Sequence, residues 1–265
     1  SLHCSLIAKR DNEMQTAYEY GIALDSKDLP KPSDIGLKAA KFAKDKLGSR
    51  SLKSQKCPII FTSRQASGLF SQLLGALSGS RQYKKTSFLL GSLEKIVLPE
   101  SISIFEDPLK IKTLGARAFD QDGVLKNKQY FVENGRVRSY LMGQYAANQL
   151  GLESTANSGG VSNCCINSNF DGGIEELTAN MSRGLIVTDL MGQGINATTG
   201  DYSRGASGFW VENGEIQFPV SGITIAGNLK DMLKNVASIG NDIDTRSNIK
   251  VGSTLISEMT IAGEG

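Results

Sequence analysis

Apolar residues recur at helical spacing in several parts of the chain, most clearly between residues 66 and 77. There, alanine, leucine and phenylalanine side chains follow one another at steps of three and four residues, which predicts a helix over 65–79. The other face of this helix has only small residues, among them Ser71, Gly75 and Ser78, so another backbone segment can approach it closely. The same spacing predicts further helices over 33–47, 142–150, 174–181 and 228–239.

Alternating patterns and short apolar runs predict strands between these helices. Residues 2–8 and 15–24 alternate on either side of a polar turn, which indicates a hairpin. Asn134-Gly135 and Asn213-Gly214 each separate two apolar runs and favour type I′ turns, because both turn residues there need a positive φ. Further strands are expected at 58–61, 185–190, 223–225 and 249–262, with polar loops at 154–173 and 192–208.

Composition and charge narrow the class of protein. The chain has 265 residues, 40% of them hydrophobic and 21% charged, which is ordinary for a globular protein with a sizeable core. The net charge is +2 and the lysines and arginines are scattered, so we expect no direct nucleic-acid partner. No apolar run reaches the length of a membrane span, and we expect a cytoplasmic protein with no membrane partner. The four cysteines have no metal-site spacing and are interpreted as reduced thiols.

Histidine is almost absent, which limits the possible chemistry. With His3 alone, a histidine base or a site with two histidine ligands must recruit residues from another chain. Neither Ser203 nor Ser207 lies in a nucleophile elbow, although a hydrolase with one of these serines and a lysine stays open as an alternative. Four carboxylates are interpreted as turn caps and as partners of Arg204 and Arg246: Asp201, Glu212, Asp242 and Asp244.

A long set of motifs resembles one protein family. The chain is similar to the PmbA (TldE) branch of the TldD/PmbA family, whose members were once described as modulators of DNA gyrase. The resemblance covers essentially the whole chain. The motifs that carry it are LMGQG at 190–194, GDYSRGASGFWVENGEI at 200–216, ITIAGNLKDM at 223–232, GNDI at 240–243, TRSNI at 245–249 and IAG at 261–263.

The resemblance implies a fold and a domain organisation. The expected fold is α+β, with mixed, largely antiparallel β-sheets in a barrel-like core and packed helices. Residues 1–50 are expected to be the remainder of a preceding, central domain. Residues 51–265 are expected to form a C-terminal metallopeptidase-type domain that lacks metal ligands. We also expect that the native protein is longer than this chain.

The same resemblance implies a zinc protease made of two different subunits. The TldD-type subunit holds zinc through an HExxxH helix and a downstream cysteine. The corresponding helix here is 65–79, and the motif positions fall on Ser71, Gln72 and Ala76. Because Ser, Gln and Ala are poor zinc ligands, we expect no cofactor in this chain and zinc in a TldD-type partner. The chain would be the noncatalytic partner in proteolysis of small unfolded peptides, such as peptide-antibiotic precursors and an antitoxin.

Two further expectations concern binding. Asp201, Tyr202, Ser203 and Arg204 are predicted to lie in a loop that lines the substrate cavity, although a network that stabilises a turn is an equal interpretation. A stand-alone regulatory protein of the gyrase-modulator type is the alternative function, and self-association of the isolated chain stays open.

Overall fold

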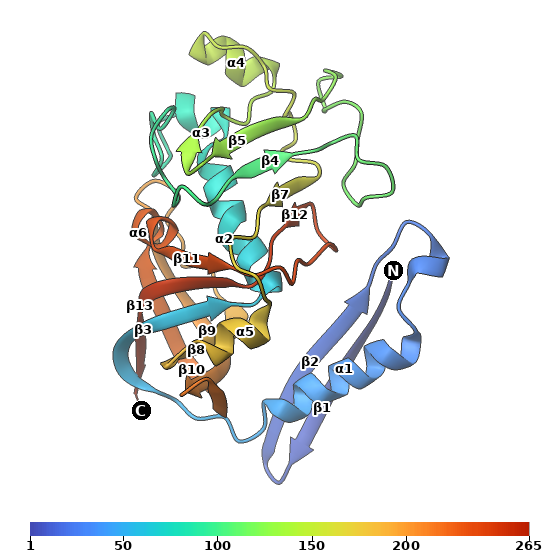
Figure 1. Cartoon of the computed structure of the whole chain (residues 1–265), viewed down its shortest axis with the longest axis vertical. Helices are drawn as coiled ribbons and strands as arrows, with labels where there is room; N and C mark the ends of the chain where they lie inside the picture. The colour runs from blue at the N-terminus through green and yellow to red at the C-terminus, as the bar shows by residue number, and fades with distance from the viewer. Residues whose placement is uncertain (265) are drawn as a thin grey trace.

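The N-terminal part of the molecule is a two-stranded sheet with one helix on it. The computed structural model describes residues 1–264. The helix buries Ile35, Ala39 and Ala43 against the two antiparallel strands. Figure 1 shows this unit, in blue, beside the rest of the molecule. Its elements are β1 (Leu2–Arg10), β2 (Glu13–Gly21), the 3₁₀ helix η1 (Ser26–Asp28) and α1 (Pro32–Asp45).

The main body contains a sheet that closes on itself. It consists of β3 (Lys53–Phe61), β8 (Arg183–Met191), β9 (Asp201–Glu212), β10 (Glu215–Asn228), β11 (Val236–Ile239) and β13 (Thr254–Glu264). The strand order is β10-β9-β8-β3-β13-β11, and β10 also pairs with β13, so five strands form a ring to which β11 is added. Only β3 and β8 run parallel among these pairs within residues 1–264. The expected α+β fold with a mixed, largely antiparallel, barrel-like core is confirmed.

A second sheet of five short strands lies above the ring in Figure 1. Its order is β12-β7-β4-β5-β6, with β12 and β7 parallel. Two short helices lie beside it, α3 (Gly79–Tyr83) and α4 (Gln144–Leu150). The strands are β4 (Ile104–Glu106), β5 (Gln129–Glu133), β6 (Arg136–Val137), β7 (Cys164–Ile166) and β12 (Ile249–Lys250).

Helix α2 (Ser63–Ala76) connects the ring with the second sheet. It begins just after β3, with Thr62 as its N-cap residue, and both views show it running from the ring toward the second sheet. Its apolar face is buried in the main core, where Phe70 and Leu73 have no exposed surface. The apolar residues that recur at helical spacing are therefore the ones that this helix buries.

Several other predictions from the sequence are confirmed. The N-terminal hairpin and α1 are present, and the helix expected at 174–181 is α5 (Ile174–Ala179). Both Asn-Gly turns have positive φ at the two turn residues, 47° and 74° at Asn134-Gly135 and 52° and 78° at Asn213-Gly214. No helix among residues 1–264 is long and apolar enough to cross a membrane.

Three predictions were wrong in their boundaries. The polar loop expected at 154–173 is interrupted by strand β7, which pairs with β4 and β12. The polar loop expected at 192–208 ends at Gly200, because residues from Asp201 onward pair with β8 and β10 as strand β9. The helix expected at 228–239 is only α6 (Leu229–Lys234), capped by the side chain of Asn228. The following residues form β11, because pairing with β13 offers their backbone groups a partner that a longer helix would exclude.

The N-terminal unit contacts the main body through a charged cluster. Glu19 of β2 accepts from both Arg64 of α2, at 3.0 Å, and Arg246. Arg246 also pairs with Asp244, at 2.8 Å, and lies over the ring of Tyr20. The expected pairing of Arg246 with a nearby carboxylate is confirmed. Whether residues 1–50 are the end of a preceding domain stays a prediction.

A second ion pair lies wholly inside the main body. Lys126 and Glu106 have no exposed side-chain surface, and Nζ and Oε1 are 3.3 Å apart. Both side chains make further hydrogen bonds. Lys126 donates to the Ala156 carbonyl, and Glu106 accepts from the Ser162 backbone N–H and the Asn157 amide. A buried pair of this kind is tolerated because each charge has several partners.

Removing one member of that buried pair should destabilise the protein strongly. Lys126→Met leaves the Glu106 charge without its partner, and we expect a loss of about 3–5 kcal/mol of unfolding free energy in urea titrations. Lys126→Met with Glu106→Gln should lose less than the single variant. The control is Lys56→Met, which breaks an exposed pair with Glu258 and should change stability by less than about 1 kcal/mol. Equal losses in the single variants would contradict the assignment.

The charged cluster at the N-terminal unit should make stability depend on pH. Burial raises the pKa of Asp244, but hydrogen bonds and charge from Arg246 lower it more, so the pKa lies below its ordinary value. The carboxylate therefore stabilises the fold above its unfolded pKa of about 3.9, and this contribution is lost as pH falls through the folded value. Asp244→Asn should be less stable than the parent at pH 7, with the gap closing toward pH 3 in urea titrations. Parallel pH profiles would refute this.

Candidate functional site

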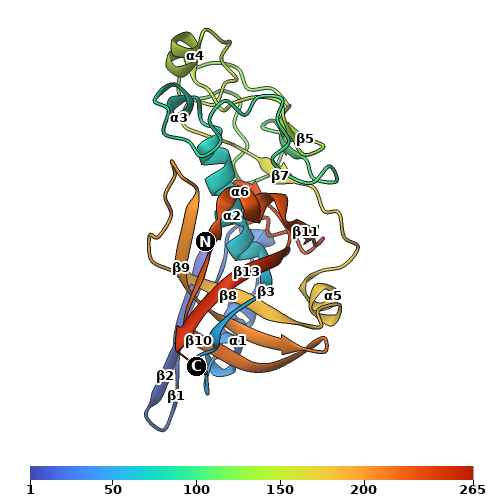
Figure 2. The same ribbon diagram turned by 90° about the vertical axis from the view of Figure 1, so that its left-hand side faces the viewer.

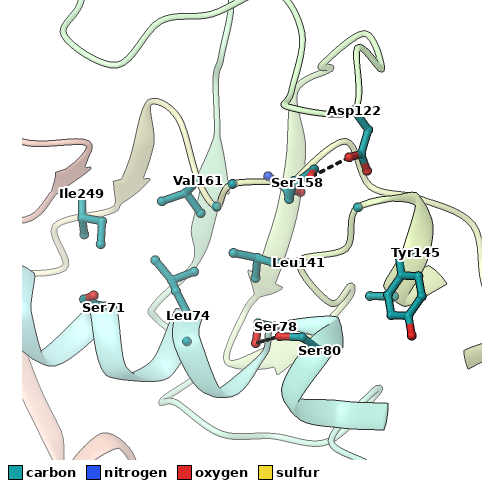
Figure 3. Close-up of a pocket in the computed structure, with 16 residues that line it drawn as sticks. Ser71, Leu74, Ser78, Ser80, Asp122, Leu141, Tyr145, Ser158, Val161 and Ile249 are labelled. Carbon is teal, nitrogen blue, oxygen red and sulfur yellow. Dashed lines mark hydrogen bonds between the residues drawn. The ribbon is translucent and has the colours of Figure 1, made fainter. Parts of the chain in front are cut away.

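A cavity of about 470 Å³ lies along the C-terminal half of α2. We call it the α2 groove. Figure 3 shows the helix as one wall, with Leu74 pointing into the cavity and Ser71 at one end. The facing wall comes from four segments that are far apart in sequence. The lining residues are Ser71, Leu74, Gly75, Ser78, Ser80, Asp122, Leu141, Gly143, Tyr145, Ala146, Asn157, Ser158, Gly159, Gly160, Val161 and Ile249.

The close approach to a facing backbone that the sequence predicts occurs not on α2 itself but in the turn that follows it, at residues 77–79. The Gly79 N–H donates to the Leu141 carbonyl at 2.8 Å, and the Leu141 N–H donates to the Leu77 carbonyl at 3.0 Å. A Cβ atom at position 79 would lie 2.5 Å from Cγ of Met142, so only glycine fits there. The groove is the space that remains along α2 before this contact, where a Cβ at Gly75 would meet only the end of the Arg81 side chain, at 4.0 Å.

Hydrogen bonds hold the polar rim of the groove in place. Ser158 Oγ donates to Asp122 Oδ1 at 2.8 Å (Figure 3). Asp122 Oδ2 accepts from the Gln144 backbone N–H at the start of α4. Gly159 and Gly160 follow with φ of 85° and 92°, which bends the chain around this end of the cavity. The rim is therefore preorganised rather than loose.

The lining suits binding better than acid–base chemistry. Its floor is apolar, made by Leu74, Leu141, Val161 and Ile249. Asp122 and Tyr145 are the ionisable side chains among the lining residues, and Asp122 is already engaged by two donors. An extended peptide could place apolar side chains on this floor and its backbone polar groups against the hydroxyls of the rim.

The three positions to which the resemblance assigns the metal motif do not form a ligand set. Ser71 is exposed in the groove, Gln72 is half-buried, and Ala76 has no exposed surface. Ala76 offers no donor atom, and serine and glutamine are not zinc ligands of the usual kind. No cluster of three His, Cys, Asp or Glu side chains suited to a metal ion occurs within residues 1–264. The residues present therefore do not fit zinc.

The predicted substrate-binding residues lie elsewhere, on strand β9. They are not in a loop, and none of them lines the α2 groove. Asp201 is bonded to Thr199 and Asn228, and Arg204 Nε donates to the Gly192 carbonyl. Tyr202 is buried, and burial raises its pKa to about 12, although Arg204 acts in the opposite direction. These contacts match the interpretation as a turn-stabilising network, and a substrate role for these residues stays a prediction.

The geometry gives little support to a serine or cysteine nucleophile. No hydrogen bond joins the hydroxyl of Ser203 or Ser207 to a lysine or histidine in the part of the chain that the structure describes. Burial raises the pKa of Cys57 to about 11, and burial also raises the pKa of Cys164 and Cys165. These thiols are protonated near neutral pH and are therefore weak nucleophiles.

The far wall of the groove could not be found from local sequence patterns. Asp122, Leu141, Ser158 and Ile249 belong to separate segments that meet only through the folding of the second sheet. The one feature of the sequence that predicts part of the groove is the row of small residues on α2. It predicts the wall made by the helix and not the facing wall. The Gly- and Ser-rich stretch at 154–173 is predicted as a surface loop, and part of it forms the rim.

Comparison with known proteins places the chain in a family. Residues 54–263 match the family model described as the PmbA/TldA metallopeptidase C-terminal domain. The chain is 46% identical over 264 residues to the metalloprotease PmbA of Escherichia coli O157:H7, covering 100% of this chain and 58% of that protein. It thus spans little more than half the length of this relative.

Solved structures agree with the match. A Bacteroides thetaiotaomicron protein described as a modulator of DNA gyrase superposes with a TM-score of 0.94 and 28% identity, covering 99% of this chain and 59% of that one. TldE from Thermococcus kodakarensis shares the fold, with a TM-score of 0.87 and 24% identity, covering 98% and 62%. The chain therefore belongs to the family of the PmbA/TldA metallopeptidase C-terminal domain.

Proposed function

We propose that this chain is part of a PmbA/TldE-type subunit that works with a TldD-type subunit as a heterodimeric zinc metalloprotease. The TldD-type partner holds the zinc ion, and this chain supplies the noncatalytic half of the complex. The substrates are small unfolded peptides, such as peptide-antibiotic precursors or an antitoxin, and the complex acts in the cytoplasm. The observation that carries the proposal is a family scaffold whose metal-motif positions hold Ser71, Gln72 and Ala76.

Two features of the chain support a role in peptide handling. The α2 groove has an apolar floor and a rim of hydroxyl groups, which suits an extended peptide with little sequence preference. Ser71, one of the positions to which the resemblance assigns the metal motif, lies at one end of that groove. A cavity suited to a peptide beside residues that do not fit a metal supports a binding role without catalysis.

The second candidate function is a stand-alone regulatory protein of the gyrase-modulator type. The structural relative from Bacteroides thetaiotaomicron has that name, which is the observation in its favour. The two functions differ in what they require: the protease role needs a TldD-type partner, and the regulatory role does not.

Reconstitution with the partner tests the proposed function directly. We expect a stable one-to-one complex with a TldD-type subunit by light scattering, and cleavage of a disordered peptide only when both chains and zinc are present. Metal analysis should find zinc in the complex and none in this chain alone. Cleavage by the partner alone at the full rate, or stoichiometric zinc in this chain alone, would overturn the proposal.

Filling the α2 groove should reduce peptide cleavage without disturbing assembly. A Cβ atom at Gly75 meets only the end of the Arg81 side chain, at 4.0 Å, so Gly75→Phe places its ring in the groove. We expect kcat/KM of the complex to fall about tenfold or more, which corresponds to about 1.4 kcal/mol of lost binding. Gly68→Phe is the control, two turns away on the same helix, where a Cβ meets nothing within 4 Å. Equal effects of the two variants would exclude the groove from substrate binding.

A further inference from the structure

A second, smaller hollow lies between the segment 88–97 and helix α6. Its volume is about 230 Å³, and we call it the lysine hollow. Phe88, Val97 and Leu233 give it an apolar wall. Three lysines also line it: Lys95 from the segment, and Lys230 and Lys234, which are four residues apart on α6.

The three lysines are free of ion pairs within residues 1–264. Two carboxylates are adjacent to these lysines in sequence: Glu94, which pairs with Arg138 at 2.9 Å, and Asp231, which is exposed and does not line the hollow. Three ammonium groups around an apolar hollow produce a positive potential that attracts an anionic group.

The hollow also contains a polar group without a partner. Ser92 is only 3% exposed, and its Oγ has no hydrogen-bond partner. The Lys95 N–H donates to the Ser92 carbonyl at 3.0 Å, so hydroxyl and ammonium come from the same turn. A buried hydroxyl that makes no bond is unfavourable, and such groups are rare in folded proteins. The Ser92 hydroxyl lies in a hollow lined by lysines, which indicates that an oxygen atom of a ligand accepts its hydrogen bond.

We infer that the lysine hollow binds the C-terminal residue of a peptide. The apolar side chain of that residue packs against the exposed side chains of Leu90 and Ile96, which also line the hollow. The α-carboxylate accepts hydrogen bonds from the Ser92 hydroxyl and from the lysine ammonium groups. A terminal residue carries an apolar group and a carboxylate on adjacent atoms, which matches a hollow too small for a drug-sized ligand. An inorganic anion would leave the apolar wall unused.

This inference rests on the proposed function in one respect, because it takes a peptide as the ligand. It assigns to this chain a contact with the peptide end that needs neither zinc nor a partner. Binding by the chain alone therefore tests the inference, and cleavage by the complex tests the proposed function. Either result can fail without the other.

Fluorescence anisotropy with short labelled peptides tests the ligand. The peptide ends in leucine with a free carboxylate, and its matched form is amidated at the same end. We expect the free acid to bind about tenfold or more tightly than the amide, since charge-assisted hydrogen bonds are lost on amidation. A third peptide with an internal Asp-Leu pair and an amidated end should bind as weakly as the amide. Equal binding of the free acid and either amidated peptide would overturn the inference.

Two serine variants separate binding from folding. Ser92→Ala removes an unpaired hydroxyl, so it should leave the melting temperature unchanged or raised, while weakening the free-acid peptide several-fold. Ser162→Ala is the matched control, because Ser162 is also buried with an unpaired hydroxyl but lies outside the hollow. It should leave peptide binding unchanged. Unaltered binding in Ser92→Ala, or equal weakening in both variants, would contradict the assignment.

Two double variants that remove the same number of positive charges test the role of the lysines. Lys230→Ala with Lys234→Ala should abolish the preference for the free acid. Lys38→Ala with Lys44→Ala removes two exposed charges from α1 and should preserve it. If both double variants reduce the preference equally, the attraction is a property of net charge and the hollow is not the site.

Discussion

The pairing of β10 with β13 is the interaction on which the rest of the structure depends. It joins Ile225 to Ile261, both without exposed surface, and it turns five strands into a ring. Closure leaves each strand of the ring with partners on both sides along part of its length, so the edges that would promote aggregation are covered. Because β3 is held in the ring, α2 starts from a fixed point and direction. The α2 groove is thus positioned by the ring, although none of its lining residues lies on a ring strand.

Helix α2 and the turn that follows it make two packing contacts of different chemistry. The apolar face of α2 packs into the main core through Phe70 and Leu73, whereas the turn receives the backbone near Leu141 at Leu77 and Gly79. The first contact is stabilised by burial of large side chains, and the second by hydrogen bonds that require small ones. Where the second contact ends, the small residues leave space, and that space is the groove. The packing of the fold and the position of the candidate site therefore both depend on α2.

The sequence predicted the elements whose pattern is local. The periodicity of α2 and the Asn-Gly turns need no distant information, and both were confirmed. Strand β9 was missed at its start because its inward positions include Ala206 and Gly208, which are small and hide the alternation. β11 was missed because its partner β13 lies further along the chain. The far wall of the groove has the same origin: its residues meet only after the second sheet has formed, so no local signal marks them.

The burial of Ala76 limits which residues this position can hold. Its side chain has no free surface, and its carbonyl accepts from the Gln82 amide at 2.8 Å and the Ser87 hydroxyl at 2.7 Å. An imidazole at this position would need a volume that its neighbours already occupy, and it would disturb a turn fixed by both donors. Placing a metal ligand here would thus require coordinated repacking of several residues. The surrounding core therefore limits this position to small side chains.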